Sequence, residues 1–387
     1  MCFKNGVFNF DKKKLRPFAP YPVFLNAFPV TYDPEAKCPH WLEFLYQILK
    51  PEDISLLQEI MGYCSLPAMP FHKIFWFYGV GRNGKDRVII TLQTMLGKEN
   101  CVQLPLSDFR ESRRFSLCQL YGKLLNVSSE PQSKYPIQTN TLKKISGETT
   151  VYAELKNKNK RFEFVNIAKP IIVGNYFPRV EDNTIAFWDR VTVLEFPRSF
   201  TGKDRITNIE RGWLENPDEK SGILNWMLEG LFRLQENREF TRSKSTEETK
   251  IEFMRVSDPF NAWLSDCCVF SVSERITRED AYQSYKDYSS EIGTAPDTRN
   301  SFYAKIRRTP KIRDYNTRSK NGFERGFQGI KLKENDSSLV ADISDVAGFY
   351  QNTLLETNKN IKRGKTPKKT ANSENSDTEE EKEELSD

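Results

Sequence analysis

Histidine is scarce in this chain, because its 387 residues include only two. The seven cysteines form no Cys-x-x-Cys pair, so the usual ligand spacing of a zinc site is missing. An odd number of scattered cysteines also argues against a disulfide framework and favours reduced thiols inside a cell. The composition therefore argues against zinc-binding folds and small secreted scaffolds.

Long apolar runs are missing as well. No stretch of about 20 apolar residues occurs, and the amino terminus does not have the form of a signal peptide. We therefore expect a soluble intracellular protein with no membrane association.

Aromatic residues, by contrast, are plentiful: they make up 12% of the chain, with 27 Phe. Such a chain can bury a sizeable core, and its length suits two or three domains of roughly 100–200 residues. The net charge is only +5, but residues 373–387 are acidic, so the remainder is more basic than the total. This balance is compatible with a nucleic-acid partner.

Two patterns follow one another along the chain. Asn5-Gly6 between Phe-rich flanks predicts a small hairpin, and apolar spacing then predicts two amphipathic helices ending near Gly62. From Lys73 onward, apolar strands alternate with helices, which predicts a three-layer α/β core with a largely parallel sheet. The predicted units are a lead-in (1–70), the core (71–205), a helical lid or linker (206–254), a winged helix (255–335) and a mostly disordered tail (336–387).

The stretch "GVGRNGKD" lies between a predicted strand, "KIFWFYG", and a predicted helix, "DRVIITLQTMLG". It fits the phosphate-binding pattern G-x-x-x-x-G-K-[ST] except at its last position. Backbone N–H groups of such a loop surround a phosphate, and the lysine bridges the β- and γ-phosphates. The alternative is a glycine-rich turn with a solvated lysine. The predicted nucleotide-binding residues are Gly79, Val80, Gly81, Arg82, Asn83, Gly84, Lys85 and Asp86.

Three further polar residues end or precede strands in the core. Glu130 follows "LLNVSS" and suits a catalytic acid, Asn175 ends "KPIIVG" and suits a sensor of the γ-phosphate, and Arg190 precedes "VTVLEF". Each has a plainer interpretation, namely a solvated Glu, a turn Asn and a surface salt bridge. Their order and spacing within about 110 residues favour the functional interpretation.

The combined motifs resemble the superfamily 3 helicases, in particular the primase-helicases of poxviruses, phages and plasmids. The resemblance covers roughly residues 3–335 and rests on "NGVFNF", "GVGRNGK", "NVSSEP", "LKKISGE", "IIVGNYFP" and "FWDRVTVLEFP". It implies an AAA+-like P-loop core that binds ATP and Mg²⁺ and works at a viral or plasmid replication site. It also implies that Lys85 binds phosphate, Glu130 and Asn175 assist hydrolysis, and Arg190 reaches a neighbouring subunit.

The same resemblance implies a homo-oligomeric ring, usually hexameric, that translocates on single-stranded DNA and opens forked duplex. Family members often carry a primase domain upstream, whereas this sequence starts almost inside the lead-in. We therefore expect no primase domain in this chain, and a separate primase as a partner.

Two basic elements suit contact with a phosphate backbone. The first is the hairpin "VYAELKNKNKRFEF", and the second is the winged helix with its helix "RNSFYAKIRR" and its wing "RSKNGFER". A solvated charged tip and a protein-binding winged helix remain the alternatives. The predicted DNA-binding residues are Lys156, Lys158, Lys160, Arg161, Arg299, Lys305, Arg307, Arg308 and Lys320, with Arg318 and Arg325 also on the wing.

Asp86 is the main departure from the family pattern, because a Ser or Thr hydroxyl usually holds the magnesium ion there. A carboxylate is also a hard oxygen ligand, so Asp86 and Glu130 are the predicted Mg²⁺ ligands. The negative charge of Asp86 near the phosphates predicts a retained but slower ATPase. The alternative is an origin- or partner-binding replication protein that binds nucleotide and hydrolyses it weakly or not at all.

Overall fold

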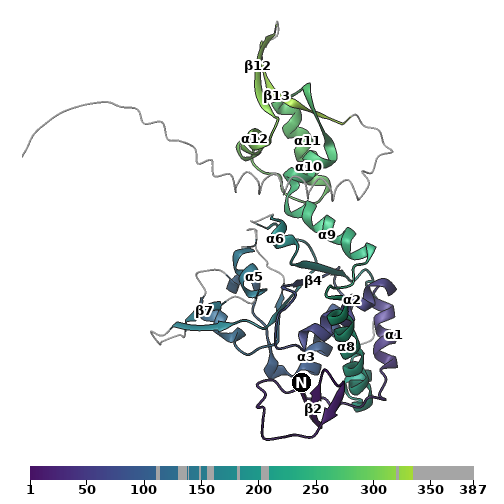
Figure 1. Cartoon of the computed structure of the whole chain (residues 1–387). Coiled ribbons are helices and arrows are strands. Elements are labelled where there is room, and N and C mark those ends of the chain that lie inside the picture. Colours follow the sequence, from purple (N-terminus) through teal and green to yellow (C-terminus); the bar gives the residue numbers. More distant parts are fainter. Residues whose placement is uncertain are drawn as a thin grey trace, which may run out of the picture.

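The computed structural model describes residues 1–109, 114–129, 137, 139–147, 150–154, 161–180, 184–201, 209–319 and 322–333. Figure 1 shows an α/β core joined through helix α9 to a smaller C-terminal module. None of the helices within these ranges is both long and apolar enough to pass through a bilayer.

The amino-terminal segment forms a small antiparallel sheet of β1 (Cys2–Phe3), β2 (Gly6–Asn9) and β3 (Lys14–Arg16). The predicted hairpin is therefore present, with Phe3 paired to Gly6. The third strand was not predicted. Two helices follow, α1 (Pro39–Ile48) and α2 (Pro51–Cys64), as the apolar spacing predicted. Each begins at a proline. Proline is tolerated there because an N–H at the first helical position would have no intrahelical partner.

The core contains a five-stranded parallel sheet in the order β10-β4-β9-β6-β5. Its strands are β4 (Ile74–Tyr78), β5 (Cys101–Val102), β6 (Leu125–Ser129), β9 (Lys169–Gly174) and β10 (Val191–Glu195). Four of them were predicted from continuous apolar runs, which a sheet covered on both faces requires. The two-residue β5 is too short to give such a signal.

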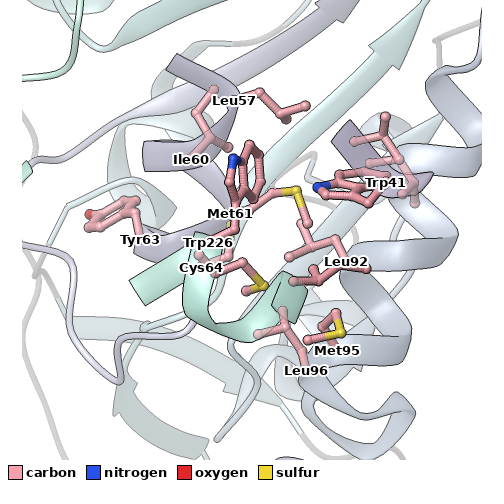
Figure 2. Close-up of a cluster of buried hydrophobic side chains, with 14 of the residues drawn as sticks. Trp41, Leu57, Ile60, Met61, Tyr63, Cys64, Leu92, Met95, Leu96 and Trp226 are labelled. Carbon is pink, nitrogen blue, oxygen red and sulfur yellow. The ribbon is translucent and has the colours of Figure 1, made fainter. Parts of the chain in front are cut away.

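Alternate residues of β4 enter different apolar clusters on the two faces of the sheet. Phe75 and Phe77 belong to one cluster, and Ile74 and Trp76 belong to the other. The first cluster is formed with α1, α2, α3 (Lys85–Leu96) and α8 (Pro217–Asn237), and Figure 2 shows its interlocking side chains, including Trp41, Met61 and Trp226. The predicted three-layer arrangement is therefore present.

The second face is covered by shorter elements. A two-stranded hairpin, β7 (Thr150–Glu154) and β8 (Arg161–Val165), projects from this side of the core (Figure 1). Helices α4 (Arg114–Leu117) and α5 (Thr139–Ile145) contact β7, and η4 (Cys118–Leu120) directly follows α4. Helix α6 (Ile185–Trp188) lies away from the hairpin, where its Trp188 packs on Phe253. Within the described residues, the other short elements are η1 (Lys98–Asn100), η2 (Leu106–Phe109) and α7 (Arg211–Leu214).

Helix α9 (Lys244–Ser257) joins the core to the C-terminal module (residues 259–332). Its start is fixed by a reciprocal capping box between Ser243 and Thr246. The sequence left this segment open between a helix and a linker, and it is a helix that contacts β10 and α10.

The C-terminal module consists of α10 (Pro259–Cys267), β11 (Cys268–Thr277), α11 (Arg278–Glu291), α12 (Arg299–Arg308), β12 (Arg313–Ser319) and β13 (Gly322–Leu332). Its antiparallel sheet has the order β11-β13-β12. The sequence predicted three helices and one hairpin, so β11 corrects that expectation. Most side chains of β11 are not buried, so the strand lacks a clear apolar alternation. The predicted tail, 336–387, lies outside the described residues.

Candidate functional site

The loop Gly79–Gly84 lies at the carboxyl edge of the parallel sheet. It leaves the end of β4 at Tyr78 and enters α3 at Lys85. Strands β9 and β6 end at Gly174 and Ser129, and these two strand ends line one cavity together with residues 81–84 of the loop. This edge is where open α/β sheets bind ligands, because loops and helix amino termini converge there.

The loop has an unusual backbone. Gly79, Arg82 and Gly84 have positive φ angles of 147°, 66° and 89°. A Cβ atom at Gly79 would collide with the side chain of Asn83 and with the carbonyl oxygen of Phe196. Only glycine fits at position 79. Alternation between negative and positive φ is typical of anion-binding nests, in which successive N–H groups converge.

The segment that follows β10 holds the loop through three hydrogen bonds. Asn83 is buried, and its Nδ2 donates to the carbonyl oxygen of Phe196 at 3.2 Å. Ser199 Oγ donates to the Gly81 carbonyl at 3.1 Å, and the Phe200 amide donates to the Arg82 carbonyl at 2.9 Å. These bonds keep the loop in one conformation, which is what a preorganised binding site requires.

The Lys85 side chain is 4% exposed and lies inside the loop. Its Nζ donates to the carbonyl oxygen of Gly79 and, at 3.1 Å, to Oδ1 of Asn175 just beyond the end of β9. The structure therefore brings together two of the predicted catalytic residues, which are 90 positions apart in the sequence.

The loop opens on a cavity of about 450 Å³. That volume falls in the usual range for small-molecule sites. One wall is apolar and includes Phe44 of α1, Phe200 and Ile209. The sequence did not reveal this wall, because Phe44 follows the ordinary core spacing of an amphipathic helix and lies far from the glycine motif.

Asp86 is exposed in the first turn of α3 and lines the same cavity as Ser129. A carboxylate and a hydroxyl at this position are hard oxygen donors, which is the ligand chemistry that Mg²⁺ prefers. A carboxylate in the first turn also interacts favourably with the positive end of the helix. Glu130, the other predicted magnesium ligand, lies outside the described residues.

Arg190 lies at the opposite edge of the sheet from the loop. It precedes β10, its carbonyl accepts from the Ile74 amide at 2.7 Å, and its Nη1 donates to the Ala186 carbonyl. Because β10 pairs with β4 from Ile74 to Tyr78, roughly 15 Å of strand separates Arg190 from the loop. Arg190 therefore does not take part in the cavity of its own chain.

The hairpin β7–β8 packs against the core through aromatic side chains of β8. Tyr121 contacts Phe162 and Phe164 edge-on, at ring-centroid distances of 4.9 Å and 5.7 Å. The backbone of Arg161 pairs with Glu154 at the outer end of the ladder. Lys156, Lys158 and Lys160 lie outside the described residues, as does the side chain of Arg161.

Three of the four predicted DNA-binding residues of α12 are in ion pairs within the module. Arg299 makes a bidentate pair with Glu279 at 2.7 Å and 2.8 Å, Lys305 pairs with Asp297 at 2.6 Å, and Arg307 pairs with Asp314 at 2.8 Å. The fourth, Arg308, is exposed. Lys320 lies outside the described residues, whereas Arg318 is exposed on β12.

The carboxylates of these pairs show the effect of their partners. Burial alone would raise the pKa of Asp297, but the hydrogen bond and charge of Lys305, with the charge of Arg179, hold it below the ordinary value. At Asp314 burial again acts upward, and hydrogen bonds from Arg307 and Arg278 reverse it, so this pKa is also lowered. Both carboxyl groups are therefore charged at neutral pH and hold α12 against its neighbours.

Two segments of the chain match known families. Residues 1–50 match a family described as "D5 N terminal like", and residues 77–190 match a family of unknown function, DUF5906. The second match contains the loop, Asn175 and Arg190.

Two viral proteins are similar in sequence at low identity. The chain is 23% identical over 238 residues to "Putative helicase 022R" of Frog virus 3 and 20% identical over 325 residues to "Putative helicase 121R" of Invertebrate iridescent virus 3. The matches cover 56% and 74% of this chain, but 24% and 34% of the relatives. The chain thus spans about a quarter to a third of the length of these relatives.

Among solved structures, the apo C-terminal region of NrS-1 matches with a TM-score of 0.43 and 15% identity, over 78% of this chain and 79% of that one. A second structure of that region, residues 305–718, gives 0.42, with 79% of each chain covered.

Proposed function

We propose that this chain is the motor part of an ATP-dependent DNA helicase of superfamily 3, working in the replication of a virus or a mobile plasmid. The observation that carries the proposal is the contact of Lys85 with Asn175 inside a glycine loop at the carboxyl edge of a parallel sheet. This is the arrangement that phosphoryl transfer needs, with a cation and an amide at one phosphate position. The similarity to viral proteins named as helicases supports the same conclusion.

In the nucleotide step, the backbone amides of the loop hold the β-phosphate of ATP, and Lys85 exchanges its protein oxygens for those of the γ-phosphate. Asn175, released from Lys85, orients the attacking water, with Glu130 as the acid that polarises it. Phe44, Phe200 and Ile209 form the apolar wall for the base. Asp86, with Glu130, would hold a Mg²⁺ ion, which would supply positive charge beside the phosphates.

The proposed assembly is a ring, most simply a hexamer, around single-stranded DNA. Arg190 is roughly a strand length from its own loop, which suits a role at the nucleotide of a neighbouring subunit. The projecting hairpin β7–β8 would grip the DNA backbone through Lys156, Lys158, Lys160 and Arg161. We further propose that the C-terminal module is a winged helix, which its order of elements supports, and that it contacts duplex at the fork. A separate primase is the proposed partner.

Strand displacement tests the motor directly. The full chain should separate a forked DNA duplex with ATP and fail to do so with a non-hydrolysable analogue. ATP-dependent ring formation on DNA should accompany unwinding, which electron microscopy can show. A protein that forms rings and binds DNA but never displaces a strand would overturn the helicase proposal and favour an origin- or partner-binding role.

Asp86 sets the expected rate of the motor. Replacing it by the usual hydroxyl, Asp86→Ser, should raise DNA-stimulated ATP turnover, because it removes a negative charge from beside the phosphates while keeping an oxygen ligand. Steady-state ATPase of the two proteins over a range of Mg²⁺ concentrations measures the effect. Loss of turnover in Asp86→Ser would instead mean that the carboxylate itself is required to hold the metal.

A further inference from the structure

A second polar cavity, of about 410 Å³, lies at the amino edge of the sheet. Lys73, just before β4, and Asp189, just before β10, form one side of it. The other side comes from the α8–α9 connection (238–242) and from α9, including Lys250. Because the glycine loop follows the carboxyl end of β4, this amino-edge cavity and the nucleotide cavity lie at opposite ends of the same strand.

Positive groups outnumber negative ones around the amino-edge cavity. The lining residues include four cations, Lys73, Arg238, Arg242 and Lys250, and three acids, Asp189, Glu239 and Glu247. Lys73 Nζ donates to the carbonyl oxygen of Asp189 at 2.7 Å, and the Arg242–Glu239 pair is long, at 3.4 Å, and exposed. The cations are therefore only partly neutralised by their own chain.

Burial and neighbouring positive charge disfavour the protonated form of both lysines. Burial lowers the pKa of Lys73 to about 8, with the like charges of Lys250 and Arg242 acting in the same direction against Asp189 and Glu247. Burial also lowers the pKa of Lys250, where Glu247 and Asp189 oppose it and Arg242 adds to it. A bound anion would offset both the burial and the repulsion.

We propose that the amino-edge cavity binds a phosphate-bearing anion through Lys73, Lys250 and Arg242. A site with two ammonium groups and a guanidinium at its rim offers charge-assisted donors to several phosphate oxygens at once. The cavity is large enough for a phosphate, a pyrophosphate or a nucleotide phosphate chain. The ligand would lie beside the turn Asp189–Arg190, so its presence would bear on the position of Arg190. The inference does not depend on ATP hydrolysis at the glycine loop.

Sulfate is the first probe, because its charge is constant between pH 6 and pH 9. Isothermal titration should use Lys85→Ala protein, in which the loop site is weakened. Removing a lysine charge, by Lys73→Gln or Lys250→Gln in that background, should lower sulfate affinity by about tenfold, the loss expected for one charge-assisted hydrogen bond. Lys98→Gln, at an exposed lysine on η1, is the matched control and should bind as its parent does.

The pH profile gives a second readout that needs no pocket variant. As the pH rises through about 8, Lys73 loses its charge, so sulfate affinity of the Lys85→Ala protein should fall between pH 7 and pH 9.5. The other facing groups, Lys250, Arg242, Arg238, Asp189, Glu239 and Glu247, shape this profile. An affinity that neither falls with pH nor changes in the two Gln variants would overturn the proposal.

The source of the phosphate is decided by comparing pyrophosphate with a 12-nucleotide oligo(dT). If Lys73→Gln weakens only pyrophosphate and ADP, the natural ligand is a free nucleotide or its product. If it weakens the oligonucleotide, the ligand is the nucleic-acid backbone. If sulfate binds but neither phosphate ligand responds to the variant, the cavity is not a phosphate site and the proposal fails.

Discussion

Three lysines of the α/β core and three cations of the C-terminal module have different kinds of hydrogen-bond partner. In the core, Lys85, Lys73 and Lys169 each donate to a backbone carbonyl oxygen, namely that of Gly79, Asp189 and Leu66. In the module, Arg299, Lys305 and Arg307 are held by carboxylates. A carbonyl oxygen carries only a partial charge, so it neutralises these three core lysines less than a carboxylate neutralises Arg299, Lys305 and Arg307. The difference indicates that Lys85 and Lys73, which line cavities, are placed for anionic ligands. The ion pairs of Arg299, Lys305 and Arg307 instead hold α12 against its neighbours.

The largest effect is expected at Lys85. Lys85→Ala should lower DNA-stimulated ATP turnover on the order of 100-fold or more, because it removes the cation that meets the γ-phosphate. Arg211→Ala removes an exposed cation that pairs only loosely, at 3.5 Å, with Glu215, and it should leave turnover unchanged. Steady-state ATPase distinguishes them. Equal activity of Lys85→Ala and wild type would mean that a lysine bonded to a carbonyl oxygen has no more functional importance than a cation paired with a carboxylate.

The next effect is on the stability of the module. Trp263 is fully buried, bonds Ser284 Oγ through Nε1 at 3.0 Å and packs on Phe302. Trp263→Ala should cost the module about 3–5 kcal/mol, as for other buried aromatic truncations. Hydrogen exchange of α12 amides measures this loss, and ATPase without DNA reports on the core. A parallel loss of core activity would mean that the two regions are not energetically separate.

A smaller effect separates the cations of α12. Arg308→Ala should weaken duplex binding about three- to tenfold at low salt, because an exposed cation near a phosphate acts through counterion release. Arg299→Ala should weaken it less, since Glu279 already neutralises that guanidinium. Fluorescence anisotropy at two salt concentrations compares them. The reverse order would show that the Arg299–Glu279 pair opens on DNA and that the helix is the main contact.

The smallest effect is a difference in pH dependence. Burial lowers the pKa of Lys73 to about 8 and of Lys169 to about 7, so the folded core binds fewer protons than the unfolded chain up to about pH 10.5. The stability of the core should therefore rise with pH across that window. Asp297 and Asp314 have lowered pKa values, so the stability they add to the module is present above pH 3.8 and lost below it.

Hydrogen exchange, corrected for the intrinsic rate at each pH, can follow both regions in one sample. Protection of β4 should increase from pH 7 to pH 9.5, while protection of α12 should fall as the pH drops from 4 to 3. A module that is equally protected at pH 3 and pH 5 would contradict the structural role of its ion pairs.

The sequence predicted the strands that carry the site and the loop that joins β4 to α3. This was possible because β4, β6, β9 and β10 are continuous apolar runs and because the glycine spacing of the loop reflects backbone conformations that other residues avoid. The short β5 and the largely exposed β11 gave no such periodicity. Local pattern was informative only where burial or backbone strain restricts the choice of residue.

Contacts between distant segments could not be predicted. Phe44 lines the nucleotide cavity but has the spacing of any core residue of α1. The pairing of Arg299 with Glu279 depends on how α11 and α12 pack. The sequence "RNSFYAKIRR" therefore suggested more basic side chains available to DNA than the structure leaves unpaired. Neither fact follows from residue type, because both depend on which elements meet in three dimensions.

Strand β10 has a consequence for timing within the proposed ring. It begins directly after Arg190, and Phe196, directly after its end, accepts the hydrogen bond that holds Asn83 in the glycine loop. If Arg190 touches the nucleotide of the next subunit, one short strand, paired along its length with β4, joins that nucleotide to the loop of this chain. A shift at one end would reach the other without any hinge between them. Neighbouring subunits would then hydrolyse ATP in sequence. In rings that mix normal subunits with subunits lacking the arginine, ATPase activity should therefore fall by more than the fraction of altered subunits.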